Sequence, residues 1–174
     1  MGMRNLSFSM FWLFSLLTFI VPIATVLYWI FFEDLHRLGF QVVPFTLDTM
    51  TINFKSRTLG CLIGFIPVSM VCYGFHQLAK LFKNYAKGQI FSAFNVSLYK
   101  KLGATLFAYA FADNLFDMLI SWAVSFQNPP GKTYFFTGVN STQLICLLMG
   151  FVVLMIAKVM QEAYRLEQEV ELTV

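Results

Sequence analysis

Four long apolar runs are the feature of this sequence that most constrains its fold. In a chain of 174 residues they occupy positions 8–32, 58–80, 102–126 and 144–160. A helix that crosses the hydrocarbon core of a bilayer, about 30 Å thick, needs about 20 mostly apolar residues. The runs therefore predict an all-α integral membrane protein with one domain, 1–174, folded as a four-helix bundle with a helical tail over 161–174.

The composition excludes a water-soluble globular domain, because only 12% of the residues are charged and 58% are hydrophobic. A soluble domain has about 25% charged residues. The same hydrophobicity excludes an intrinsically disordered chain. A net charge of +3 is too small for a nucleic-acid-binding surface. We therefore expect the lipid bilayer to be the main partner, and no direct contact with nucleic acid.

The charges predict how the chain is oriented. Eight of the twelve basic residues lie in the N-terminal segment, the middle loop and the tail: Arg4, Lys80, Lys83, Lys87, Lys100, Lys101, Lys158 and Arg165. The positive-inside rule then places these three regions, and both termini, in the cytoplasm. In the first outer loop, segments 40–43 and 50–54 have strand-like character and predict a short extracytoplasmic hairpin.

Two carboxylates interrupt the third run. Asp113 and Asp117 are four residues apart and so share one helix face, with Asn114 beside them. Because a charged residue near a helix centre costs about 2.5–3.5 kcal/mol on insertion scales, we predict an intramembrane polar site here. One interpretation is a proton or cation site, or a polar contact with a partner helix; the other is a hydrogen-bonded cluster inside the bundle. For the second, the expected partners are Thr18, Thr25, Ser69 and Tyr73.

Small residues at four-residue spacing predict close contacts between helices. Gly60 and Gly64 have this spacing in the second run, and Ala104, Ala108 and Ala112 have it in the third.

The middle loop and the tail have their own patterns. Gly88 permits a turn, and Ser92 is the predicted N-cap of the helix that leads into the third run. After Lys158, apolar residues at helical spacing predict an amphipathic helix beyond the bilayer. Its glutamates suit the lysines of the middle loop or, alternatively, form a docking surface for a cytoplasmic partner. Residues 169–174 are equally compatible with an extended edge.

Catalytic signatures are absent from the sequence, which contains no nucleophile–base pair and no phosphate-binding glycine motif. The two histidines, His36 and His76, are predicted to lie on opposite sides of the membrane and so cannot share a metal. We expect no enzymatic activity, no cofactor and no metal.

Two motifs resemble the signatures of a bacterial membrane-protein family classed as a domain of unknown function. The first is Gly88-x-Ile90-Phe91-Ser92-x-x-Asn95, followed by Lys100-Lys101-Leu102-Gly103. The second is Glu162-Ala163-x-Arg165-Leu166-x-x-Glu169-x-Glu171-Leu172-Thr173-Val174. The resemblance marks two sets of candidate residues: Gly88, Phe91, Ser92 and Asn95 in the loop, and Arg165, Glu169, Glu171 and Leu172 in the tail.

The resemblance implies a four-helix protein of the bacterial cytoplasmic (inner) membrane. Members are often encoded beside a small helix-turn-helix regulator, which implies a regulatory role, but the resemblance supplies no activity. We therefore expect a non-enzymatic accessory, sensory or regulatory protein that binds a partner through its cytoplasmic loop and tail. The alternative is a small oligomeric transporter or channel that uses Asp113 and Asp117 as a proton or cation site.

Overall fold

The computed structural model describes residues 2–38, 54–125, 136 and 138–173. The regular secondary structure of this part of the chain is entirely helical, which confirms the all-α prediction. The helices are α1 (Met3–Ile30), α2 (Phe32–Arg37), α3 (Phe54–Ala86), α4 (Ala93–Ser125) and α5 (Ser141–Thr173). The predicted hairpin lies outside the described residues, except Phe54, which begins α3 and is therefore not part of a strand.

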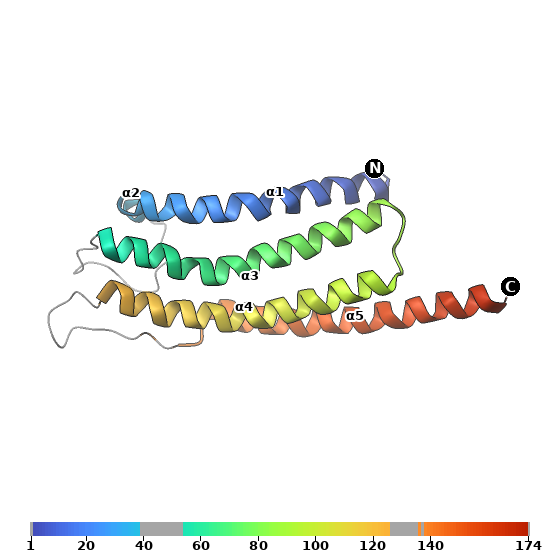
Figure 1. Ribbon diagram of the computed structural model, residues 1–174. Helices are drawn as coiled ribbons and strands as arrows, with labels where there is room; N and C mark the ends of the chain where they lie inside the picture. Colours follow the sequence, from blue (N-terminus) through green and yellow to red (C-terminus); the bar gives the residue numbers. More distant parts are fainter. Residues whose placement is uncertain (1, 39–53, 126–135, 137, 174) are drawn as a thin grey trace.

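The four long helices lie side by side in chain order, as an open row (Figure 1). Helix α1 packs along α3, α3 along α4, and α4 along α5, while within the described residues no backbone contact joins α1 to α4 or α5. The prediction of a bundle therefore misses how the helices are arranged. Lipid tails are as apolar as the face of another helix. In a membrane, the hydrophobic effect therefore does not drive such a row of helices to close into a bundle.

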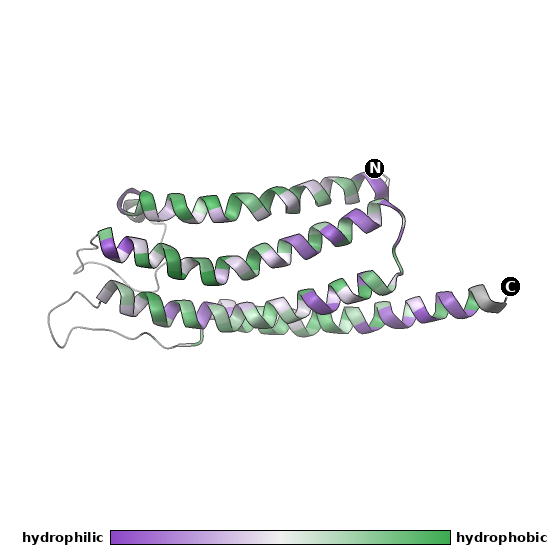
Figure 2. Cartoon of the chain, in the orientation of Figure 1, coloured by the Kyte–Doolittle hydropathy of each residue, from purple (hydrophilic) through white to green (hydrophobic). Residues whose placement is uncertain are grey.

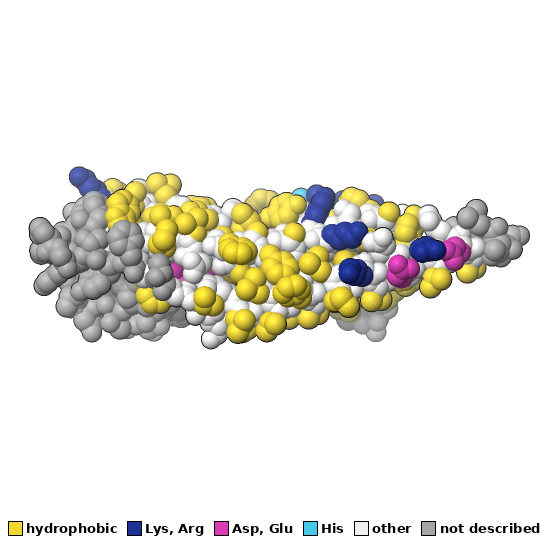
Figure 3. Space-filling model, turned by 90° about the horizontal axis from the view of Figure 1, so that it is seen from below, with side chains coloured by type: hydrophobic (Ala, Val, Ile, Leu, Met, Phe, Trp, Pro, Cys, Tyr) yellow, Lys and Arg dark blue, Asp and Glu magenta, His cyan; other side chains and the backbone are white. Residues whose placement is uncertain are grey.

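Large apolar side chains cover the outside of the row, as they must in a bilayer. Phe19 on α1 is 72% exposed, and Phe111 on α4 is 73% exposed. Figure 2 shows apolar residues along the middle of the helices, and Figure 3 shows hydrophobic side chains spread over the middle of one face of the molecule. Such a surface is not stable in water, and it matches the lipid-facing surface of a membrane protein.

Three helices are long and apolar enough to cross a membrane: α1, α3 and Ser141–Val170 of α5. Helix α4 has 33 residues, as α3 and α5 do, but it is not among the three. Its apolar run contains Asp113, Asn114 and Asp117, which lower its hydropathy.

The N- and C-termini lie at the same end of the row as the link between α3 and α4 (Figure 1). Basic side chains also gather towards this end (Figure 3). We call it the lysine-rich end and define it by Lys80, Lys83, Lys87, Lys100, Lys101 and Lys158. Near it, Lys100 Nζ donates a hydrogen bond to Gln161 Oε1 at 2.9 Å, which joins α4 to α5.

Glycines set the closest approaches between the helices. A Cβ atom added to Gly60 would lie within 2.7 Å of three indole carbons of Trp29, so only glycine fits beneath this ring. A Cβ atom on Gly64 would also contact Trp29, at 3.5 Å. Trp29 packs with Phe116 of α4 in one buried cluster. The predicted contact at Gly60 and Gly64 is thus confirmed, and it lets a side chain of α1 reach α4 across α3.

The alanine row of α4 was predicted less well. Ala112 is buried, but Ala104 and Ala108 are exposed on the outside of the row. The close contact between α4 and α5 is made instead by Gly103 and Gly150, where a Cβ atom on either glycine would lie within 3.4 Å of the other's carbonyl oxygen. Spacing alone did not distinguish these neighbouring faces of the helix.

Candidate functional site

Asp113 and Asp117 lie near the end of α4 that is far from the lysines. At 1.5 Å per helical residue, they are about 20 Å and about 26 Å farther along the helix than Lys100. If Lys100 marks one edge of a hydrocarbon core about 30 Å thick, both carboxylates lie in the opposite third of that core. The sequence had placed them near the middle of the span.

The first turn of α5 faces these carboxylates, and a reciprocal capping box begins this helix. The backbone N–H of Gln143 donates to Asn140 Oδ1 at 2.9 Å, and the backbone N–H of Asn140 donates to Gln143 Oε1 at 3.2 Å. In such a box the side-chain oxygens of two residues satisfy each other's backbone donors. The amide NH₂ groups of both side chains remain available for other acceptors.

Those NH₂ groups donate to the two aspartates. Asn140 Nδ2 reaches Asp113 Oδ2 at 3.2 Å and Asp117 Oδ2 at 3.4 Å, and Gln143 Nε2 reaches Asp113 Oδ2 at 3.2 Å. Tyr109 donates its hydroxyl to Asp113 Oδ1 at 3.4 Å. The carboxylates also lie at the positive end of the α5 dipole, which favours negative charge. Neutral donors and a helix terminus therefore stabilise the pair.

The structure thus places the aspartates in a hydrogen-bonded cluster, but with partners other than those predicted. Thr18, Thr25 and Ser69 donate to carbonyl groups of their own helices, and Tyr73 is exposed. Sequence reasoning placed 140–143 in an outer loop and missed Asn140 and Gln143. The pattern Asn140-x-x-Gln143 before an apolar run, which is a capping-box pattern, could have identified them.

Asn114 belongs to a different contact. Its Nδ2 donates to the carbonyl oxygen of Gly138 at 2.9 Å, and about two turns farther along α4 the hydroxyl of Ser121 accepts the backbone N–H of Phe136 at 2.9 Å. These two polar residues of α4 hold the segment that leads into α5. Asn114 therefore positions the α5 terminus and is not part of the carboxylate cluster with which it was grouped.

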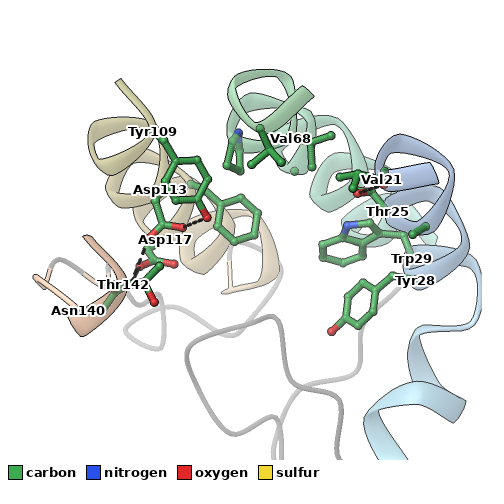
Figure 4. Close-up of a pocket in the computed structure, with 15 residues that line it drawn as sticks. Val21, Thr25, Tyr28, Trp29, Val68, Tyr109, Asp113, Asp117, Asn140 and Thr142 are labelled. Atoms are coloured by element: carbon green, nitrogen blue, oxygen red, sulfur yellow. Dashed lines mark hydrogen bonds between the residues drawn. The ribbon is translucent and has the colours of Figure 1, made fainter. Parts of the chain in front are cut away.

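A cavity of about 520 Å³ lies beside the carboxylates. Asp113 and Asp117 lie on one wall with Asn140 and Thr142, and α1 forms the opposite wall with Trp29 (Figure 4). The α3 segment around Pro67 forms a third wall between these two. The cavity therefore has one acidic wall, while its other walls are largely apolar.

The loop between α3 and α4 is built by the predicted motif. Gly88 has a φ of +79°, a left-handed conformation that favours glycine. Ser92 caps α4, as predicted, because its hydroxyl accepts the backbone N–H of Asn95 at 3.2 Å. Phe91 has no such role. Its side chain is 43% exposed, and that of Phe94 is 53% exposed.

Asn95 is the centre of this loop and is completely buried. Its Nδ2 donates to the carbonyl oxygens of Gln89 at 2.7 Å and Ile90 at 2.9 Å, and its Oδ1 accepts Asn84 Nδ2 at 2.7 Å. These bonds fix the loop against the end of α3. Gly88, Ser92 and Asn95 therefore have structural roles, whereas Phe91 and Phe94 are exposed.

The tail is helical to Thr173, so the extended edge is wrong. Arg165 Nε pairs with Glu169 Oε1 at 3.0 Å, one turn apart on the exposed surface. Val159, Leu166 and Val170 are more than 60% exposed, which gives the tail an exposed apolar stripe. The side chains of Glu171 and Leu172 lie outside the described part of the structure.

A second cavity, of about 650 Å³, lies between the loop and the tail. The loop contributes Ile90, Phe91 and Phe94, and α5 contributes Glu167. The two regions singled out by the sequence motifs thus meet across one groove.

Comparison with known proteins identifies the family but no activity. No curated protein and no solved structure gives a significant match to the chain. A family described as "Protein of unknown function (DUF2975)" matches residues 12–174. This span covers all five helices except the first turns of α1, and it contains both cavities. The chain belongs to this family of unknown function.

Proposed function

We propose that this protein is a non-enzymatic, multi-pass protein of the bacterial inner membrane, with an accessory, sensory or regulatory role. In this proposal α1, α3, α4 and α5 all cross the bilayer. The lysine-rich end faces the cytoplasm and carries both termini. The hydropathy of three helices, the apolar exterior and the clustering of lysines support this orientation.

The protein binds a cytoplasmic partner through a loop–tail surface, formed by Ile90, Phe91, Phe94, Leu166, Glu167 and Val170. The observation that carries this proposal is the groove of about 650 Å³ between the loop and α5. Leu166 and Val170 are 61% and 63% exposed. Glu167 lies about 14 Å beyond Lys158 along α5, so this part of the helix extends past the lipid. Apolar side chains that are exposed to water in one place mark a protein contact.

The groove favours one kind of occupant. Its loop wall combines the apolar side chains of Ile90, Phe91 and Phe94 with polar neighbours such as Gln89 and Ser92, and its tail wall offers the carboxylate of Glu167. A complementary segment has apolar side chains on one face, to fill the space beside Phe91 and Phe94, and a Lys or Arg that reaches Glu167. We therefore propose an amphipathic helix of a cytoplasmic protein as the partner segment.

Photocrosslinking in bacteria that produce the full chain tests this proposal. A photoreactive phenylalanine analogue replaces Phe94, and as a control it replaces Phe111, which is 73% exposed in the middle of α4. We expect one discrete protein adduct from position 94 and none from position 111. Glu167→Lys should abolish the adduct, whereas Glu162→Lys, the same change one and a half turns away, should leave it.

The crosslinked peptide identifies the partner, and charge reversal then tests the contact. An acidic residue in place of the partner's Lys or Arg should restore crosslinking to the Glu167→Lys variant. No adduct, equal adducts from positions 94 and 111, or an adduct unaffected both by Glu167→Lys and by removal of residues 168–174 would contradict the proposal.

The cavity beside Asp113 and Asp117 favours a second candidate, a small oligomeric transporter or channel that moves protons or cations. A row of helices that is not closed needs a second copy to enclose a pathway. Proton flux into liposomes containing the protein tests this candidate. Flux should be lost in the Asp113→Asn/Asp117→Asn variant, and absence of flux in the wild type rejects the idea.

A further inference from the structure

The cavity beside the aspartates has the size and the two-sided chemistry of a ligand site. Its volume of about 520 Å³ lies within the range of about 300–1,000 Å³ that is typical of small-molecule sites. It is far larger than a bare metal ion requires. We propose that this cavity binds a hydrophobic organic cation of the quaternary ammonium or phosphonium class, with its charge beside Asp113 and Asp117 and its apolar body against α1 and α3.

The charge of the site points to a cation. Asp117 is only 5% exposed, and within the described residues it receives one side-chain hydrogen bond, from Asn140, which is long at 3.4 Å and reaches Oδ2. Among the described residues nothing donates to Asp117 Oδ1. Asp113, in contrast, receives three hydrogen bonds. A bound cation would therefore give the carboxylate of Asp117 the partner that the described residues do not supply.

In the part of the chain that the structure describes, the walls of the cavity carry no positive group. No Lys, Arg or His is among the described residues that line it, although two carboxylates do. A buried carboxylate without a charged partner is costly in a medium of low dielectric constant, and a cation beside it removes much of that cost. The NH₂ groups of Asn140 and Gln143 give only partial compensation, because they are neutral.

The rest of the wall suits an apolar body better than water. Trp29 stacks on Phe32 with 5.4 Å between ring centroids and an interplanar angle of 10°, so its position is fixed. Val68 and Val71 of α3 and Phe116 of α4 complete this apolar wall. In Figure 4 the acidic wall and the indole of Trp29 lie on opposite sides of the hollow. A ligand with a charged group and a bulky apolar part would contact both.

Binding of tetraphenylphosphonium to the full-length protein tests the proposal. The protein is placed in nanodiscs of phosphatidylcholine, a lipid without net charge. Equilibrium dialysis of the radiolabelled cation then measures binding, and binding to empty nanodiscs is subtracted. Tetraphenylborate, an anion of nearly the same size and shape, is the matched probe. We expect saturable binding of the cation, at no more than one molecule per chain, and no saturable binding of the anion.

Variants then locate the bound cation. Asp117→Asn and Asp113→Asn should each weaken binding of tetraphenylphosphonium by at least about tenfold, since tenfold corresponds to the loss of one modest charge interaction. Glu162→Gln, which removes the same charge from the exposed tail, should leave binding unchanged.

Three results would overturn the proposal. They are absence of saturable cation binding, equal binding of tetraphenylborate, and cation binding that survives both aspartate substitutions. The comparison of the two probes uses the wild-type protein alone, so a variant that fails to fold does not weaken it. The assay contains no partner protein, so its outcome is independent of the loop–tail surface.

Discussion

Asn140 joins the beginning of α5 to the carboxylates of α4, and substitutions can separate its two contributions. Its Oδ1 caps the helix by accepting the backbone N–H of Gln143, and its Nδ2 donates to Asp113 and Asp117. Loss of an N-cap costs about 1 kcal/mol. A buried acceptor that loses its donor costs about 1–3 kcal/mol. Asn140→Ala loses both contributions, so we expect a destabilisation of about 2–4 kcal/mol.

Two further substitutions divide this total. Asn140→Ser keeps a side-chain oxygen that can cap α5 but lacks the NH₂ donor, so it should lose only the second part. Asn140→Asp keeps the cap acceptor but adds a third carboxylate beside Asp113 and Asp117. Because like charges repel in a medium of low dielectric constant, this variant should be the least stable. The expected order of stability is wild type, Ser, Ala, Asp.

Thermal unfolding in detergent measures the effect. A dye that fluoresces on reaction with thiols reports exposure of Cys61, Cys72 and Cys146, none of which is fully exposed in the folded chain. For a chain of this size, 1 kcal/mol lowers Tm by about 2–4 °C, so Asn140→Ala should unfold at least about 4 °C below the wild type. Asn5→Ala, at an exposed position near the start of α1, is the control and should not change Tm.

Two results would show that Asn140 does not stabilise the carboxylates. If Asn140→Asp were as stable as Asn140→Ser, then the NH₂ group would not be stabilising negative charge, and the assigned contact between α4 and α5 would be wrong. An unchanged Tm for Asn140→Ala would lead to the same conclusion.

Other substitutions test the packing and the loop by the same assay. Gly60→Ala should lower Tm, because overpacking against Trp29 costs about 1–3 kcal/mol. This cost exceeds the gain of about 1 kcal/mol from the helix propensity of alanine. Gly74→Ala is the control in the same helix: its added Cβ would make only an ordinary contact at 3.7 Å, so Tm should stay unchanged or rise. Asn95→Ala should lower Tm by several degrees, since three side-chain hydrogen bonds in a completely buried position are lost; an unchanged Tm would show that the loop does not depend on them. Arg165→Ala removes an exposed ion pair and should change stability by less than about 0.5 kcal/mol; a large loss would mean that the tail is packed against something.

The predictions that held follow from local chemistry. The cap at Ser92 and the turn at Gly88 depend on a few neighbouring residues, and the structure has both. The contact at Gly60 and Gly64 follows from their lack of side chains. Apolar runs likewise predict helices, because a bilayer requires every backbone group to be bonded within its own segment.

The predictions that failed depend on how helices pair across long stretches of chain. The amide partners of Asp113 come from residues about 30 positions later, at a helix start that composition places outside the membrane. Whether Gly103 or Ala104 contacts α5 depends on a rotation of the helix by one residue, which spacing does not determine. The open row depends on which faces lipid covers, and in a membrane this is not encoded by hydrophobicity.

The sidedness of the chain is the claim on which the proposed function depends most directly, and one labelling measurement tests it. In a chain whose native cysteines are replaced by alanine, single cysteines are introduced as Leu38→Cys, directly after α2, and Glu162→Cys, on the tail, both at exposed positions. Intact spheroplasts are treated with a maleimide that cannot cross membranes. We expect position 38 to be labelled at once and position 162 to be labelled only after the membrane is permeabilised. Labelling of position 162 in intact spheroplasts would place the loop–tail surface outside the cytoplasm, which is the opposite of the proposed orientation.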